Sequence, residues 1–157
     1  LAVDISSSVD LDEYNLQMNG LAAAFRHPEV IAAIEGLEGG GIALTLVQWS
    51  GTWAQSAVVG WTRVFDEGSA AAFAQLLEDA KRAFPGGATS ISGAIHYGLT
   101  ELQSNDFDGG QMVIDIMGDG RGNDGPLPTS VRDRALAMGV TINGVVVSSY
   151  KMTALQE

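Results

Sequence analysis

Three oxygen-bearing side chains follow the first apolar run of the sequence at alternate positions, namely Asp4, Ser6 and Ser8. Side chains of an extended chain alternate between two faces, so these three can point the same way. Carboxylate and hydroxyl oxygens are ligands that hard divalent cations accept. The spacing therefore indicates half of a cation site. The alternative interpretation is that Ser6, Ser8 or Asp10 caps the helix that follows.

Two further residues could supply the other half. Thr89 lies in the segment PGGATS, and Asp119 directly follows the apolar run MVIDIMG. Together with Asp4, Ser6 and Ser8 they form a set of oxygen ligands with two carboxylates, which suits Mg²⁺ or Mn²⁺ better than Zn²⁺. Taken separately, the alternative interpretation of Thr89 is a helix cap, and that of Asp119 is a turn residue in a glycine-rich loop.

The elements that must position these residues follow from apolar periodicity and from glycine and proline breaks. A helical pattern covers about 12–35 and is broken by Pro28 near His27. A hairpin of two strands is expected within 42–64, with its turn at Ser50 to Thr52. The remaining expected elements are a helix at 70–84 capped by Ser69, a helix at 90–104 started by Ser90 or Ser92, a strand at 112–120, a helix at 128–139 and a strand at 140–149.

This order of elements predicts a single α/β domain over residues 1–157. Continuous apolar strands separated by helices are typical of a doubly wound, mostly parallel sheet with helices on both faces, here with one antiparallel edge strand from the hairpin. Ligands of such sheets bind at the carboxyl ends of the strands. The candidate residues all follow strands or precede helices at that edge.

Composition limits the classes of function. The net charge of -11 argues against binding nucleic acid or an anionic membrane surface, and the absence of cysteine excludes thiolate metal sites, disulfides and cysteine nucleophiles. No apolar run is long enough for membrane insertion. The chain starts without Met inside its first strand, so we expect sequence to be missing at both ends. A trimmed signal peptide would favour a periplasmic or secreted protein; without one the protein would be cytoplasmic.

The residues quoted above resemble a von Willebrand factor type A domain with a metal ion-dependent adhesion site. The motif Asp-x-Ser-x-Ser is matched by Asp4-Ile5-Ser6-Ser7-Ser8, its Thr by Thr89 and its later Asp by Asp119. More narrowly, nearly the whole chain resembles a bacterial domain family of unknown function (DUF1194-like). Ser7 stands where Gly is common in the family, and from the resemblance we expect one more strand and a terminal helix beyond the given sequence.

The resemblance implies a non-enzymatic module that binds a protein partner. Its Mg²⁺ (or Mn²⁺) would be held by Asp4, Ser6, Ser8, Thr89 and Asp119, and an Asp or Glu carboxylate of the partner would complete the shell. A scaffold with a vestigial site is an alternative.

A phosphatase is the alternative from another class. The segment GDGRGND resembles the metal loop of haloacid dehalogenase-like phosphatases, with Asp4 as nucleophile and Asp119 and Asp124 on Mg²⁺. Those enzymes need a second Asp where this chain has Ser6, which cannot serve as a general acid near neutral pH.

The tryptophans around the expected hairpin leave two interpretations open. Trp49, Trp53 and Trp61 either pack in the core and at the sheet edge or form an aromatic rim beside the metal.

Overall fold

The structure, a computed structural model, describes residues 1–147. Its strands are β1 (Ala2–Asp4), β2 (Ile42–Trp49), β3 (Gln55–Val64), β4 (Met112–Gly118) and β5 (Val140–Val146). Its helices are α1 (Leu11–Phe25), α2 (Pro28–Glu35), α3 (Glu67–Asp79), α4 (Ile91–Gln103) and α5 (Thr129–Ala137). Among the described residues no helix is long and apolar enough to cross a membrane.

The five strands form one sheet in the order β3-β2-β1-β4-β5. Within residues 1–147, only β3 runs antiparallel to its neighbour, and it lies at the edge of the sheet. The short strand β1 is central, pairing with β2 through Asp4 and Trp49 and with β4 through Val3 and Met117. The predicted α/β class, the hairpin and the antiparallel edge strand are confirmed.

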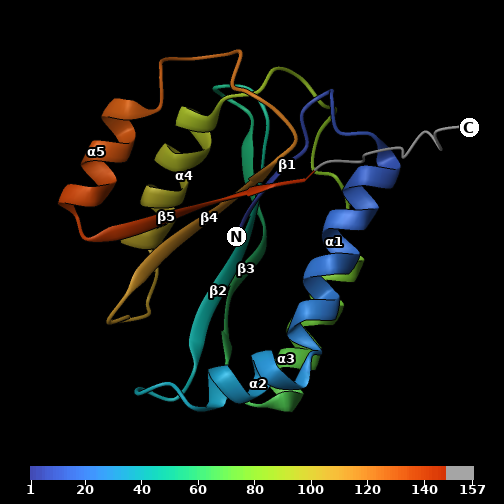
Figure 1. The fold of residues 1–157 in the computed structure, drawn as a ribbon, viewed down its shortest axis with the longest axis vertical. Coiled ribbons are helices and arrows are strands. Elements are labelled where there is room, and N and C mark those ends of the chain that lie inside the picture. Colours follow the sequence, from blue (N-terminus) through green and yellow to red (C-terminus); the bar gives the residue numbers. More distant parts are fainter. Residues whose placement is uncertain (148–157) are drawn as a thin grey trace, which may run out of the picture.

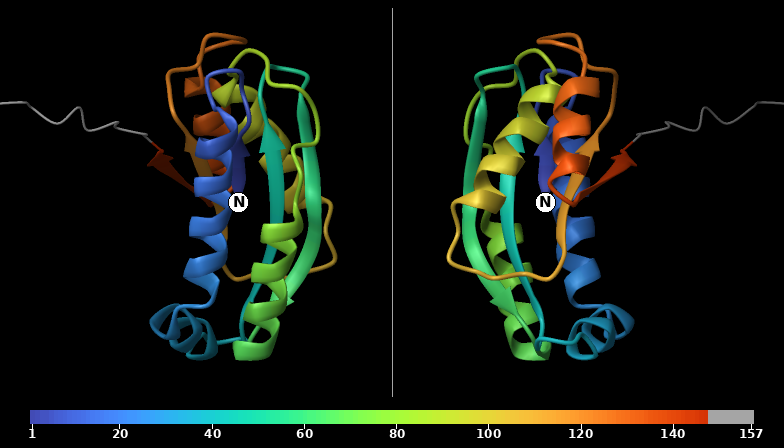
Figure 2. Two further views of the ribbon diagram at one scale, coloured as in Figure 1. Left: turned by 90° about the vertical axis from the view of Figure 1, so that its right-hand side faces the viewer. Right: turned by 90° about the vertical axis from the view of Figure 1, so that its left-hand side faces the viewer.

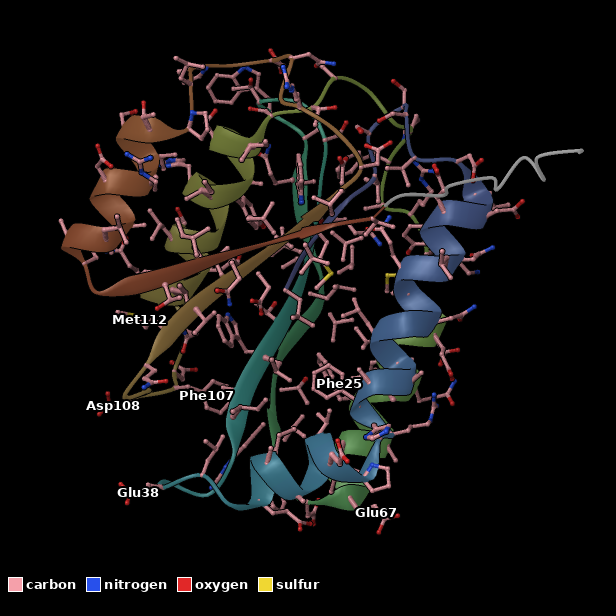
Figure 3. The ribbon with its side chains drawn as sticks, viewed as in Figure 1. Phe25, Glu38, Glu67, Phe107, Asp108 and Met112 are labelled. Carbon is pink, nitrogen blue, oxygen red and sulfur yellow. The ribbon has the colours of Figure 1, made fainter. Side chains whose placement is uncertain are left out.

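Helices cover both faces of the sheet. Figure 1 shows α4 and α5 on one face and α1 and α3 on the other, with α2 below α1. Each face has its own apolar cluster. Phe25 of α1 meets Phe73 of α3 edge to face, with ring centroids 4.9 Å apart, and lies between α1 and the sheet (Figure 3). The cluster on the other face includes Leu99 of α4 and Ala135 of α5.

Local sequence sets the first helices. Asp10 is the N-cap of α1 and forms a capping box with Glu13, and His27 precedes Pro28 at the start of α2. The predicted break of the 12–35 pattern is therefore confirmed. Because Asp10 caps α1, neither Ser6 nor Ser8 is needed for that role.

The predicted helix at 70–84 is wrong at both ends. Asp66, not Ser69, is the N-cap of α3, and Ser69 is the N3 partner of its capping box. The helix ends at Asp79 because the segment after it bonds elsewhere. The buried Gln48 accepts from the amide of Ala83 at 2.7 Å and donates to the carbonyl of Lys81 at 3.0 Å. Those backbone groups are thus satisfied without a further helical turn.

The last strand is shorter than predicted within the described range. It ends at Val146, and residues 148 and 149 of the predicted strand lie outside the described residues.

Candidate metal centre

Four connecting segments meet at the carboxyl ends of the parallel strands. They are the β1–α1 loop at 5–10, the β2–β3 turn at 50–54, the end of the α3–α4 connection at 86–90 and the β4–α5 loop at 119–128. All views of Figures 1 and 2 place them together at the top of the molecule. Hydrogen bonds join them, since the amide of Ser7 bonds the carbonyl of Gly87 and the amide of Ser90 bonds that of Ser50.

Asp4 is fully buried at the end of β1. Its Oδ1 accepts the amide of Ser6 at 2.7 Å, whereas its Oδ2 has no hydrogen-bond partner among the described residues. A Cβ at Gly118 would lie 3.1 Å from this Oδ2, so glycine leaves room for the carboxylate. Burial raises the pKa of Asp4, and the nearby Asp119 adds to this, although the bonds from Ser6 oppose it. Burying a carboxylate with an oxygen that has no partner costs free energy, unless a cation binds to that oxygen.

Ser6, Ser8 and Asp119 form a continuous chain of oxygens next to Asp4. The hydroxyls of Ser6 and Ser8 are 3.0 Å apart, and Ser8 donates to Oδ1 of Asp119 at 2.9 Å. Ser6 is buried while Ser8 is exposed, so the chain leads from the interior to solvent. The structure brings these residues together although Ser8 and Asp119 are 111 residues apart in sequence.

Thr89 is positioned through its backbone. Asn123 Oδ1 accepts from the amide of Thr89 at 2.9 Å, and the amides of Asn123 and Asp124 both donate to the carbonyl of Thr89. No hydrogen bond within residues 1–147 involves the hydroxyl of Thr89, and Ser90 rather than Thr89 caps α4. The hydroxyl is thus available as a ligand.

Two features of this region were missed from the sequence. Gly86 lies so close to the β1–α1 loop that a Cβ would come within 2.9 Å of backbone atoms of Ile5 and Ser6. Arg82 donates to the carbonyls of Ile5 at 2.7 Å and Val9 at 2.9 Å. The Gly-Gly pair before Ala88 could have indicated a close approach. Nothing in the helical pattern distinguished Arg82.

Asn123 and Asp124 each support a neighbouring segment of the site. Asn123 holds Thr89, and Oδ2 of Asp124 accepts from the amide and the hydroxyl of Thr52 at 2.7 and 2.8 Å. These bonds lower the pKa of Asp124. One carboxylate oxygen of Asp124, a residue that the phosphatase alternative places on the metal, is thus already engaged by the β2–β3 turn.

The donor set suits a hard cation. Within the part of the chain that the structure describes, no cluster of three or more His, Cys, Asp or Glu could hold a metal ion. The candidate site instead combines two carboxylates with three hydroxyls, and the unpartnered Oδ2 of Asp4 is the atom that a cation would satisfy. Oxygen ligands of this kind fit Mg²⁺ or Mn²⁺ with water completing the shell.

Comparisons with known proteins show the fold and the family of the chain. The chain has the fold of a von Willebrand factor type A domain. It belongs to the protein family of unknown function DUF1194, whose family model matches residues 1–157. A comparison with curated protein sequences gives no match.

Three solved structures illustrate the likeness. Proximal thread matrix protein 1 from the mussel byssus, solved with a zinc-occupied MIDAS motif, is 18% identical with a TM-score of 0.70, over 91% of this chain and 36% of that one. Manganese-loaded TRAP protein of Plasmodium vivax is 17% identical with a TM-score of 0.63, over 94% and 56%. An aerotolerance-related membrane protein of Bacteroides fragilis is 17% identical with a TM-score of 0.60, over 93% and 65%. The chain spans about a third of the byssus protein and less than two thirds of the other two.

Proposed function

We propose that this chain is a single domain that binds a divalent cation and, through it, an acidic group of a protein partner. The cation ligands are Asp4, Ser6, Ser8, Thr89 and Asp119. The observation that carries the proposal is the buried carboxylate of Asp4, whose Oδ2 has no hydrogen-bond partner within residues 1–147. Two residues further on, Ser6 begins a chain of oxygens that leads through Ser8 to Asp119. The occupied sites named for the mussel and Plasmodium proteins support a divalent metal.

We propose that the bound cation is Mg²⁺ or Mn²⁺. The only charged ligands proposed are Asp4 and Asp119, so a bound cation would retain Lewis acidity toward an additional oxygen ligand. A carboxylate from an Asp or Glu side chain matches that need better than an amide or hydroxyl, because it adds a negative charge. The role of this chain is to hold the two carboxylates and three hydroxyls in place, and no catalytic step is assigned to it.

A matched pair of small probes tests this function. N-acetylaspartate amide and N-acetylasparagine amide differ only in the side-chain carboxylate, and binding of each to the ¹⁵N-labelled protein is followed by NMR with Mg²⁺ and with chelator. We expect shifts at Ser8, Thr89 and Asp119 with the acidic probe in Mg²⁺, and none with chelator or in Asp4→Ala. Equal shifts with both probes, or shifts that persist in chelator, would contradict the proposal.

A further inference from the structure

Two large apolar side chains project into solvent from the loops around the candidate metal centre. Trp53 in the β2–β3 turn is 95% exposed, and Leu127 in the β4–α5 loop is 78% exposed. Single exposed apolar residues are ordinary on protein surfaces. These two share the end of the sheet that carries the proposed metal ligands, whereas Trp49 is buried in the core.

Hydrogen bonds join the β2–β3 turn to the β4–α5 loop. Asp124 accepts two hydrogen bonds from Thr52, the residue before Trp53. Gly125 lies against the same side chain, since a Cβ there would come 2.9 Å from Oγ1 of Thr52, and its φ of 77° favours glycine. Leu127 follows two residues later. The backbone directly before Trp53 and two residues before Leu127 is therefore already held in place, which reduces the entropy lost on binding.

Further hydrogen bonds connect these two loops to the segment that carries the candidate ligand Thr89. Asp124 contacts both Thr52 and Thr89. Its amide donates to the carbonyl of Thr89, and its carboxylate accepts from the amide of Thr52. The amide of Ser90 also bonds the carbonyl of Ser50 at the start of the β2–β3 turn. Trp53, Leu127 and Thr89 thus belong to one connected set of loops at one end of the molecule (Figure 2).

We propose that Trp53 and Leu127 form the apolar contact for the protein partner whose carboxylate reaches the metal. This inference rests on the proposed function and specifies the partner. It is a protein segment in which an exposed Asp or Glu stands near aliphatic or aromatic side chains. Trp is among the residues most enriched at sites that dominate binding energy. The net charge of -11 opposes a polyanionic partner such as nucleic acid, so the apolar contact supplies affinity that long-range electrostatics does not.

Selection of peptides tests the inference. A displayed library of short random peptides is selected on the Mg²⁺-loaded protein, and the strongest binder is synthesised for calorimetry. We expect it to contain an acidic residue together with aromatic or aliphatic ones. Trp53→Ala and Leu127→Ala should each weaken its binding by about tenfold or more, as for anchors of an interface. Their affinity for Mg²⁺ alone should stay within about twofold of wild type, because neither side chain is a proposed ligand.

A control variant and two contrasting outcomes keep the proposals separate. Leu37→Ala removes a partly exposed leucine beside Glu38, which lies at the opposite end of the molecule (Figure 3), and should bind the peptide as wild type does. Mg²⁺-dependent peptide binding that survives Trp53→Ala and Leu127→Ala would overturn the inference and leave the function standing. Peptide binding that is unchanged both by chelator and by Asp4→Ala would overturn the proposed metal-dependent function. A library that yields no binder to the metal-loaded protein would overturn the apolar contact.

Discussion

The carboxyl group of Asp4 is costly to the protein when no cation is bound. It is fully buried, one of its oxygens has no partner within residues 1–147, and its pKa is raised by burial. Ser6 satisfies only the other oxygen. Residues that lower stability in this way are typical of functional sites, where binding compensates for the strain.

Replacing Asp4 with Asn should stabilise the metal-free protein. The side-chain oxygen of Asn can still accept the hydrogen bond from the backbone amide of Ser6, while the uncompensated charge of the carboxylate is removed. A gain of about 1 kcal/mol would raise Tm by about 2–4 °C for a domain of this size. Thermal unfolding in chelator measures the effect, and the same variant should show no change of Tm on adding Mg²⁺. A lower Tm than wild type in chelator would show that the carboxylate is stabilising.

The raised pKa of Asp4 also predicts how stability and metal affinity vary with pH. The folded protein holds this proton more tightly than the unfolded chain, whose carboxyl has the usual pKa of 3.8. As pH falls through the raised value, the metal-free protein therefore gains stability from this group, and a cation must displace the proton to bind. Calorimetry at several pH values should show weaker Mg²⁺ binding and more proton release at the lower ones. Affinity independent of pH, without proton release, would contradict this prediction.

At the scale of the elements, the closeness of two loops determines whether Thr89 can reach the site. Gly86 packs against the backbone of Ile5 and Ser6, and Ser7 donates its amide and hydroxyl to the carbonyl of Gly87. Arg82 also holds the β1–α1 loop by donating to the carbonyls of Ile5 and Val9. The loop that carries Ser6 and Ser8 is thus fixed by backbone contacts rather than by the proposed ligands alone.

A pair of neighbouring glycines isolates this effect. Gly86→Ala would place a Cβ within 2.9 Å of three backbone atoms, so the 86–90 segment must move away from the β1–α1 loop. Gly87→Ala meets only Oγ of Ser50, at 3.4 Å. We expect Gly86→Ala to weaken Mg²⁺ binding by about tenfold or more, in line with the effect of disturbing supports of metal ligands. Gly87→Ala should change it by less than about threefold. Equal affinities of the two variants in calorimetry would refute the role of this contact.

The elements also show what the sequence could and could not predict. Strand patterns and capping residues predicted the sheet, the hairpin and the break at Pro28, because these depend on neighbouring residues. The end of α3 was mispredicted since Gln48, far away in sequence, bonds the segment after it. Asn123 and Arg82 act through backbone groups of other loops, and such contacts leave no periodic pattern. The motif placed Asp4, Ser6, Ser8 and Asp119 correctly as neighbours, but not the bonds that support Thr89.

Across the whole molecule, the proposed ligands come from three segments that are distant in sequence, namely the end of β1 with the β1–α1 loop, the α3–α4 connection and the β4–α5 loop. A cation bound to all three would be absent from the unfolded chain, so it should stabilise the folded state. At a concentration about 100 times Kd the gain is about 2.7 kcal/mol, which corresponds to about 5–10 °C in Tm. Thermal unfolding over a range of Mg²⁺ concentrations measures this, and a Tm that does not change up to saturating metal would argue against a site that joins the loops.

Calorimetric titration of Mg²⁺ and Mn²⁺ into the wild-type domain and into Asp4→Ala is the direct test of the proposed metal site. The matched control is Asp108→Ala, which removes an exposed carboxylate far from the site (Figure 3) and so separates the site from the general acidity of the surface. We predict saturable binding of one ion to wild type and Asp108→Ala, and its loss in a folded Asp4→Ala protein. Binding that is equal in all three proteins would show that the cation is held elsewhere and would contradict the central claim.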